Sequence, residues 1–414
     1  PEVFVIDRGG VIRYQGRIDD QYQPGIARAE ATQHDLKDAI EELLAGRSVK
    51  IARTTAVGCL ISLPRTATTS ESASNVTFCN QVIRVLSEHC IDCHREGEIG
   101  PFTLDDYDEV VGWADMCLEV IEQGRMPPWH ADPAHGQFAN ARHMPDSDKR
   151  LLQEWVDAGT PYGNVGDLPP PVARVVGWQL PQSPDAVFQM SDQPFQIPAE
   201  GTVEYQYFVV DPEFKEDKWI RAVQVIPGNP AVVHHCIAFT RPPDGADFRD
   251  IGLLSAYVPG QRTAIRPDGY AQRVSANSKI VFQMHYTPNG KPESDMTRIG
   301  LVFAEPEQVT HEVYALGGIE QEFEIPPHAA AHTVTGMLSG FPADGLLLSV
   351  TTHLHLRGKS YRLIAETDRG SEVLLDVPQY DFNWLHRYEL LSPRPLRTMR
   401  SLGFEATFDN SADN

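Results

Sequence analysis

The feature that most constrains the fold is a change in the spacing of apolar residues near residue 175. Beyond it, short segments of alternating apolar and polar residues are separated by turns, and no long helical period competes with them. Such alternation predicts antiparallel strands, and roughly 240 residues suffice for two β-sandwiches of the jelly-roll type. We place the seam between them at 305–307, so that the expected sandwiches span 175–304 and 305–414. The clearest strand candidates are 203–210, 219–226, 279–287 and 346–356.

Two smaller segments precede the β region, each followed by a linker rich in Ser, Thr or Pro (62–75 and 166–174). Residues 1–62 begin with a hairpin signal around 7–10 and continue into a helix that ends at Gly46. The motif from Thr32 to Asp35 predicts a capping box for that helix. Residues 76–165 show helical spacing with long loops, which predicts an all-α domain. The chain is therefore expected to be multidomain.

The charge balance excludes one class of partner. The chain of 414 residues carries 57 Asp and Glu against 35 Lys and Arg, a formal net charge of -22. Such an acidic chain repels phosphate backbones, so we expect no nucleic-acid partner. No stretch reaches the ~20 apolar residues of a membrane-spanning helix, so we expect no membrane span.

The pentapeptide Cys-Ile-Asp-Cys-His at 90–94 indicates covalent haem. Cys90 and Cys93 can each add to a vinyl group of one haem, and His94 then becomes an axial ligand. We expect Met126 to be the opposite ligand, with Met116 and Met144 as rivals. The alternatives are a redox-active Cys-x-x-Cys pair or half of a zinc site, which would recruit a further pair such as Cys79 and Cys117. Those same two cysteines are also candidates for a disulfide.

The segment 76–165 resembles the small c-type cytochrome modules of multidomain bacterial proteins. The resemblance rests on 90–94, 100–104, 126–129 and 155–159. It implies a cytochrome c-like domain that binds haem c.

Three histidine-bearing segments dominate the second half of the chain. Because side chains alternate along a strand, His353 and His355 are expected to share a polar face, with Leu354 and Leu356 on the core face. By the same rule His285 lies opposite three apolar neighbours (Phe282, Met284 and Tyr286). The adjacent pair His234 and His235 can reach one ion only at a strand end or a bulge. Together the five histidines favour metal binding, and imidazole suits copper and zinc alike.

These motifs resemble those of the copper type II, ascorbate-dependent monooxygenases, a family that includes peptidylglycine and dopamine monooxygenases. The matching segments are His-His (234–235), Gln-x-His-Tyr (283–286) and His-x-His-Leu-x-Gly-Lys (353–359), and the match spans roughly 190–414. The resemblance implies two coppers. His234, His235 and His285 would hold the electron-transfer copper, while His353 and His355 would hold the oxygen-binding copper and form the catalytic centre.

Two departures from that family bear on the site. The second copper of the family also takes a Met ligand, which is expected beyond Asn414; Met399 falls too early and is interpreted as a strand or core residue. Peptide-hydroxylating relatives carry an Arg two residues before the His-x-His motif, where this chain has Thr351. A peptidylglycine substrate is therefore disfavoured, although Arg357 or Arg362 remain candidates for binding another anion.

Residues 1–62 resemble the C-terminal half of a thioredoxin-like α/β domain of the peroxiredoxin type. The resemblance rests on 1–7, 10–16, the helix that follows, and 57–59 with Cys59. It implies that the redox cysteines of such a domain lie upstream of Pro1.

The resulting hypothesis is a monooxygenase that hydroxylates a C–H bond of a small-molecule or peptide substrate with O2. Electrons would come from ascorbate, from a donor protein, or through the fused haem. The alternatives are a non-catalytic copper and haem electron-transfer protein and a zinc hydrolase. Covalent haem and copper favour a periplasmic or secreted protein.

Overall fold

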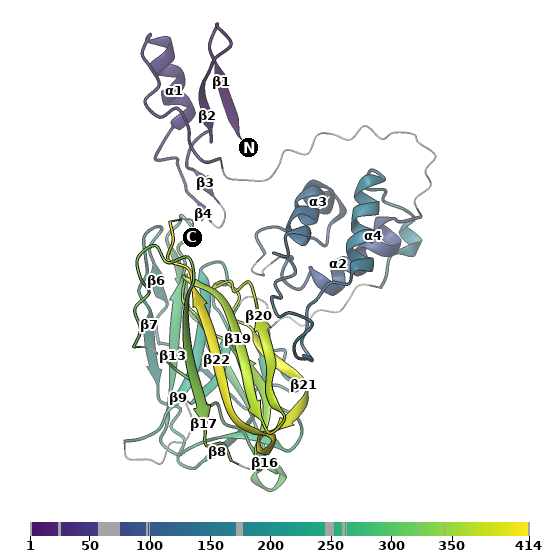
Figure 1. Ribbon diagram of the computed structural model, residues 1–414, viewed down its shortest axis with the longest axis vertical. Coiled ribbons are helices and arrows are strands. Elements are labelled where there is room, and N and C mark those ends of the chain that lie inside the picture. The colour runs from purple at the N-terminus through teal and green to yellow at the C-terminus, as the bar shows by residue number, and fades with distance from the viewer. Residues whose placement is uncertain are drawn as a thin grey trace.

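The computed structural model describes residues 2–23, 26–56, 75–96, 98, 100–170, 177–244, 252–258, 261, 263–320, 322–342 and 344–412. The chain is mostly β, with 35% of residues in strands and 16% in helices. Figure 1 shows a tall β body, a helical segment beside it and a small N-terminal unit above it. None of the described helices has the length and apolar character that crossing a membrane requires.

The first β-sandwich is built from two facing sheets, and its core is almost entirely aliphatic and aromatic. One sheet has the strand order β10-β9-β13-β7, and the other has the order β16-β12-β8-β15-β5, with β11 paired to β8 and β16 (His311–Glu312) coming from the part of the chain that follows. A separate pair, β14-β6, lies at the end. The bounds are β5 Ala186–Gln189, β6 Phe195–Ile197, β7 Gln206–Val210, β8 Lys218–Ile226, β9 Val233–Arg241, β10 Leu253–Tyr257, β11 Thr263–Ile265, β12 Tyr270–Val274, β13 Lys279–Tyr286, β14 Glu293–Asp295 and β15 Arg298–Phe303.

The second β unit follows the short 3-10 helix η3 (Pro306–Gln308), which occupies the predicted seam. Its sheets are β17-β22-β19-β20 and β18-β21. The two-residue strand β16 (His311–Glu312) returns to pair in parallel with β12 of the first sandwich. The remaining bounds are β17 His332–Ser339, β18 Leu346–Thr351, β19 Gly358–Thr367, β20 Gly370–Val377, β21 Arg387–Pro395, η4 Leu396–Thr398 and β22 Met399–Phe408. Met399 is a buried core residue, as predicted.

The N-terminal unit consists of two hairpins and one helix. The bounds are β1 Val3–Ile6, β2 Ile12–Gly16, β3 Tyr22–Gln23, β4 Ile26–Ala27 and α1 Asp35–Leu44. The predicted hairpin and helix are confirmed, and apolar residues of the hairpin, including Ile6 and Ile12, stay exposed. The predicted capping box is wrong, because the Thr32 hydroxyl donates to the buried Asp20 carboxylate and His34 is the N-cap. Pro1 and the segment 57–59 with Cys59 lie outside the described residues.

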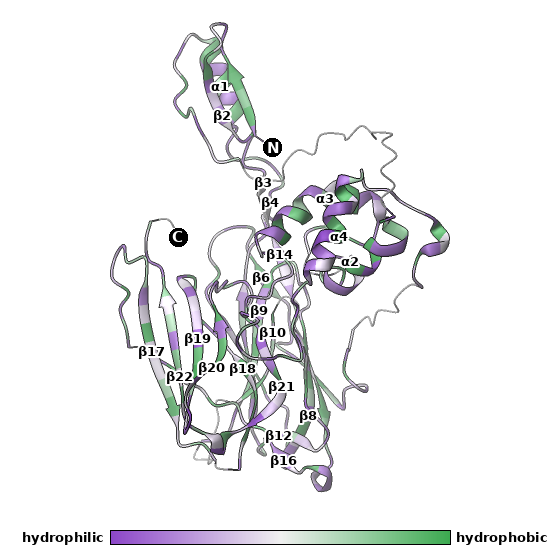
Figure 2. Ribbon diagram, turned by 45° about the vertical axis from the view of Figure 1, so that its right-hand side comes forward, coloured by the Kyte–Doolittle hydropathy of each residue, from purple (hydrophilic) through white to green (hydrophobic). Residues whose placement is uncertain are grey.

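The helical segment contains η1 Phe78–Val82, α2 Ile83–His89, α3 Tyr107–Glu122, α4 Asp146–Asp157 and η2 Val165–Asp167. The helices carry hydrophilic and hydrophobic residues on different faces (Figure 2), and the apolar faces meet around the fully buried Trp155. The Trp155 indole N–H donates to the carbonyl of Pro161, which satisfies its one polar group.

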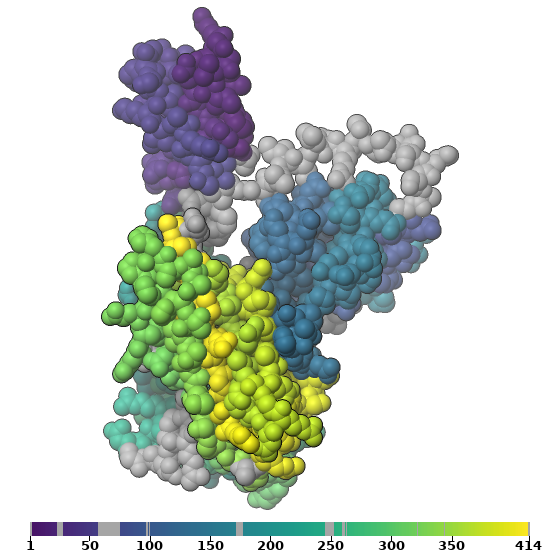
Figure 3. Space-filling model, in the orientation of Figure 1, coloured from purple at the N-terminus to yellow at the C-terminus, as the bar shows by residue number. Residues whose placement is uncertain are grey.

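The prediction of an all-α, cytochrome c-like module at 76–165 is wrong. In the described chain the helices are short and few against a β majority, and residues 125–145, between α3 and α4, form no helix. We call these residues the connecting arm. The arm packs on the second β unit: Ala131 lies in that unit's core, and Trp129 contacts Tyr388 with ring centroids 5.0 Å apart. Figure 3 shows this part of the chain resting against the C-terminal strands.

Backbone and amide contacts fix the connecting arm to strand β21. Phe138 forms a β-bridge with Leu390, and the Asn140 side chain donates to the carbonyl of Arg387 at 2.6 Å. The helical spacing of apolar residues in the flanking segments does not continue through the arm. The apolar residues of the arm pack instead against a sheet more than two hundred positions away in the sequence.

Candidate metal centre

The centre of the candidate site lies where strands β9 and β13 run side by side. In this antiparallel pair His285 stands opposite His235, and the register then shifts so that Tyr286 pairs with Val233. The shift leaves His234 as the extra residue of a bulge. This is the geometry that the sequence required for two adjacent histidines to face one ion.

The alternation predicted for β13 is confirmed. Phe282, Met284 and Tyr286 are buried in the sandwich core, whereas His285 is only partly buried on the opposite face. A period of two therefore directs the imidazole away from the core and toward the pair on β9.

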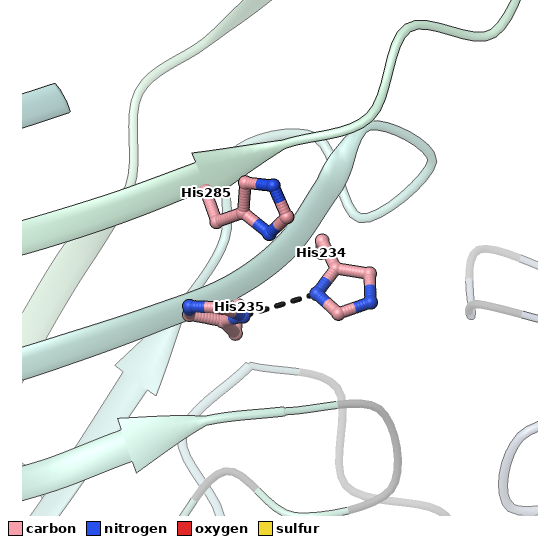
Figure 4. A group of neighbouring side chains, drawn as sticks. All are labelled: His234, His235 and His285. Atoms are coloured by element: carbon pink, nitrogen blue, oxygen red, sulfur yellow. Dashed lines mark hydrogen bonds between the residues drawn. The ribbon is translucent and has the colours of Figure 1, made fainter. Parts of the chain in front are cut away.

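The three imidazoles of His234, His235 and His285 converge on one small space. One potential ligand atom from each lies within 4.8 Å of the other two. The Nδ1 atoms of His234 and His235 are 3.0 Å apart, and Figure 4 shows the three rings gathered at the ends of the two strands. Two nitrogens that bind one ion at about 2.0–2.1 Å in a tetrahedral site lie about 3.3 Å apart, so the observed spacing suits a shared ion.

Two nitrogens of this cluster have no hydrogen-bond partner among the described residues. Nε2 of His235 and Nδ1 of His285 are both buried and unpaired. A buried polar atom without a partner costs roughly 1–3 kcal/mol, so these unpaired nitrogens favour a further ligand at the cluster. The donor set, three neutral imidazoles without a carboxylate, fits copper or zinc.

Burial keeps these imidazoles neutral, which is the form that binds a metal. Burial, reinforced by the neighbouring imidazoles, lowers the pKa of His235 to about 2 and that of His285 to about 4. Burial also lowers the pKa of His234. Protons therefore compete weakly for the three lone pairs near neutral pH.

Aromatic rings and one amide hold the imidazoles in place. Tyr205 stacks on His285 with ring centroids 4.9 Å apart, and Phe382 stacks on His234 at 5.1 Å. The side-chain oxygen of Asn383 lies 3.1 Å from Nε2 of His234, which leaves Nδ1 of that ring for an ion. Sequence reasoning missed Tyr205, Phe382 and Asn383, because they stand outside the histidine motifs and no local pattern distinguishes them.

A buried carboxylate supports the backbone on either side of the cluster. Asp295, 1% exposed, accepts hydrogen bonds from the backbone N–H groups of Gly228 and Asn229, just before β9, and from the hydroxyls of Tyr286 and Thr297. It thereby ties the turn that leads to His234 to the residue that follows His285. Sequence reasoning missed Asp295 as well.

His353 and His355 lie next to this cluster but not on a strand. Strand β18 ends at Thr351, so the prediction that the strand continues to residue 356 is wrong. Alternation nevertheless persists, with Leu354 buried and both imidazoles outward, but Leu356 is exposed instead of facing the core. The two rings are 5.1 Å apart, and His353 lies 6.3 Å from His235. All five imidazoles thus form one group rather than two separate pockets.

One of the two anion-binding candidates already has acidic partners. Arg362 is paired with Asp376 at 2.8 Å and lies 3.8 Å from Glu405, so its charge is already balanced. Thr351, at the family's Arg position, is exposed at the end of β18.

Residues 90–94 lie just after α2 in a tight turn. Cys90 and Cys93 form no disulfide with another described cysteine, and Nδ1 of His94 lies 3.2 Å from the carbonyl oxygen of Phe102. That contact leaves Nε2 of His94 as the candidate axial ligand. A Cβ at Gly100 would come within 2.9 Å of His94 Nδ1, so the backbone there closes tightly behind the imidazole.

The structure does not place Met126, the other predicted haem ligand, in contact with the turn at 90–94. No described contact links Met126 to His94; Met126 follows α3, and its backbone N–H donates to Val120. Its rival Met144 is a buried core residue of the helical segment. Cys79 and Cys117 are free thiols, so they form no disulfide.

A second group of potential ligands lies on the helical segment. Glu88, His89 and Asp148 have ligand atoms within 4.8 Å of one another, but Nε2 of His89 is already 3.0 Å from Asp148 and Glu88 is exposed. This arrangement is typical of a surface ion pair.

Comparisons with known proteins assign no family. No protein-family description matches the sequence, and no curated protein matches it. Among solved structures, one of the Macrobrachium rosenbergii nodavirus is 12% identical, covering 59% of this chain and 92% of its own, with a TM-score of 0.16. An oxalate decarboxylase structure is 9% identical, covering 69% of this chain and 88% of its own, with a TM-score of 0.11. Similarity this low carries no argument about function.

Proposed function

We propose that this chain is a copper-dependent monooxygenase that hydroxylates a C–H bond of its substrate with O2. The observation that carries the proposal is the cluster of His234, His235 and His285, with two unpaired buried nitrogens. The imidazoles of His353 and His355, beside it, supply a further ligand pair. These are the five histidines that the copper type II monooxygenase resemblance assigns to its two coppers, although here they form one group.

The residues of the chain would divide the work as follows. His234, His235 and His285 would hold one copper, and His353 and His355 would provide two ligands to a second. The bound copper supplies the one-electron steps and the activation of O2. The surrounding rings of Tyr205 and Phe382 limit access of water and fix the imidazole orientations.

Haem at Cys90, Cys93 and His94 is the proposed route for electrons, with ascorbate as the alternative reductant. The contact of His94 Nδ1 with the Phe102 carbonyl, which leaves Nε2 of His94 for an axial bond, supports this assignment. Since covalent haem and copper are characteristic of exported proteins, we propose a periplasmic or secreted location.

A non-catalytic electron-transfer protein is the second candidate. The ring distance of 6.3 Å between His235 and His353 favours it, because five imidazoles in one group are compatible with a single metal centre. Hydroxylation in the proposed family needs two.

The number of copper ions bound per chain and the consumption of O2 without added substrate distinguish the monooxygenase from the electron-transfer protein. We expect the full chain to bind Cu(II) with an EPR spectrum that shows nitrogen coupling, and His285→Ala to lose that coupling while His34→Ala, an exposed control, keeps it. The monooxygenase also predicts O2 consumption with ascorbate that is lost in His353→Ala. One copper per chain without O2 consumption would favour electron transfer, and zinc retained in preference to copper would refute both.

A further inference from the structure

A cavity of about 340 Å³ lies between the helical segment and the second β unit, beside the histidine cluster. One wall comes from the end of α3 and the start of the connecting arm, and the other comes from the loop between β20 and β21 together with the residues that lead into β19. Its lining residues are Gln123, Gly124, Arg125, His130, Leu356, Gly358, Gln379, Tyr380, Asp381, Phe382 and Asn383.

The cavity is continuous with residues that touch the candidate metal centre. Phe382 stacks on His234 and lies 5.9 Å from His285, ring centroid to ring centroid. Asn383 contacts Nε2 of His234, and Leu356 directly follows His355 in the chain. A molecule held in the cavity would therefore lie one side chain away from the imidazoles.

The charged groups that line the cavity already have hydrogen-bond or ion-pair partners in the protein. The Arg125 guanidinium contacts Glu119 at 3.2 Å and the side-chain oxygen of Gln123 at 2.8 Å. The Asp381 carboxylate accepts from the backbone and side-chain N–H groups of Asn383, both at 2.9 Å. An anionic ligand would have to compete with Glu119 for the Arg125 guanidinium, whereas an uncharged ligand can share the polar groups that line the cavity.

The remaining lining groups suit hydroxyl recognition. The Gln379 amide offers both a donor and an acceptor, and Asp381 retains acceptor capacity. The Phe382 ring and the Leu356 side chain add apolar contact surface. Amides, a carboxylate and an aromatic ring around a cavity at the small end of the usual 300–1,000 Å³ range favour a compact polar molecule.

We propose that this cavity binds the substrate, and that the substrate is a small uncharged polyhydroxylated compound such as a monosaccharide or a polyol. The helical segment thereby has a role besides carrying residues 90–94, because it forms one wall of the cavity. The identification of the ligand as substrate rests on the proposed function; the binding of the ligand does not.

Calorimetric titration of the metal-free full chain tests the binding. The probes are glucose and sorbitol, with acetate and ethylamine as charged comparisons. We expect the polyols to bind and the charged probes not to. Gln379→Leu, which removes a hydrogen-bonding amide, should weaken polyol binding about tenfold, and Leu356→Trp, which fills the cavity, should abolish it. Gln153→Leu, on the exposed side of α4, is the matched control and should bind as the unaltered chain does.

The outcomes separate this inference from the proposed function. Polyol binding that is equal in all variants, or absent, or preference for a charged probe would overturn the inference, whether or not copper binds. Polyol binding with no copper at His234, His235 and His285 would leave the cavity assignment intact and refute the proposed function. With copper loaded, glucose should alter the Cu(II) EPR spectrum. Thermal melts identify a variant that fails to fold, and Gln379→Leu remains informative if Leu356→Trp does.

Discussion

Copper affinity should depend far less on pH than in an ordinary histidine site. The perturbation is a change from pH 7 to pH 5. Three imidazoles with the usual pKa near 6.5 would be almost fully protonated at pH 5, and proton competition would lower copper affinity about 10⁴-fold over this interval.

The structure predicts a much smaller loss. Burial lowers the pKa of His235 to about 2 and that of His285 to about 4, so at pH 5 at most about one-tenth of either imidazole is protonated. The pKa of His234 is lowered as well, mainly by burial. Even if His234 kept an ordinary pKa, it alone would reduce affinity only about 30-fold. We therefore expect a loss of at most about 30-fold.

Competition against a chelator of known pH dependence, followed by Cu(II) absorbance or EPR, measures this quantity. His285→Ala should lower affinity at both pH values, and His34→Ala should change neither. A loss of about 10³-fold or more between pH 7 and pH 5 in the unaltered chain would falsify the argument that the imidazoles are buried and preorganised as neutral ligands.

Three further predictions concern stability and haem. His386 is buried, and burial lowers its pKa to about 3. Below pH 6.5 the His386 imidazole is therefore protonated in the unfolded chain but stays neutral in the folded chain. Its contribution to the free energy of unfolding consequently falls by about 1.4 kcal/mol per pH unit between pH 6.5 and 3. His386→Phe should reduce that slope in urea unfolding at pH 7, 5 and 4, and an unchanged slope would contradict the assignment. Asp295→Ala should cost about 3–5 kcal/mol in the same assay at pH 7, because it leaves buried donors unsatisfied, and a loss below 1 kcal/mol would show that the site relaxes. Replacing Cys90 and Cys93 together by Ser should make any haem extractable with acidified acetone; haem that is already extractable from the unaltered chain would exclude covalent attachment.

Local periodicity explains which parts of the site were predictable. Phe282 and Met284 face the core and His285 faces away, because side chains on a strand alternate whatever the neighbouring strand is. The need for a bulge at His234 follows from the same rule, since adjacent residues on a regular strand cannot share a face.

The connecting arm shows where periodicity fails. Trp129 and Ala131 belong to the core of a sheet formed by the far end of the chain, and nothing in their local sequence indicates that partner. The same holds for Phe382 and Asn383, which reach His234 across about 150 positions. Such contacts are selected by the packing of whole sheets, which a window of ten or fifteen residues does not contain.

The amino-acid sequence by itself determined the β-rich second half, the faces of its strands and the identity of five imidazoles as potential ligands, because strand alternation and ligand chemistry are local properties. Only the tertiary structure decided that those imidazoles form one group, that the buried Asp295 carboxylate holds the turn before them, and that the helical segment forms one side of a cavity beside them. The reason is that convergence depends on long-range packing, whose free energy is shared by residues far apart in the chain.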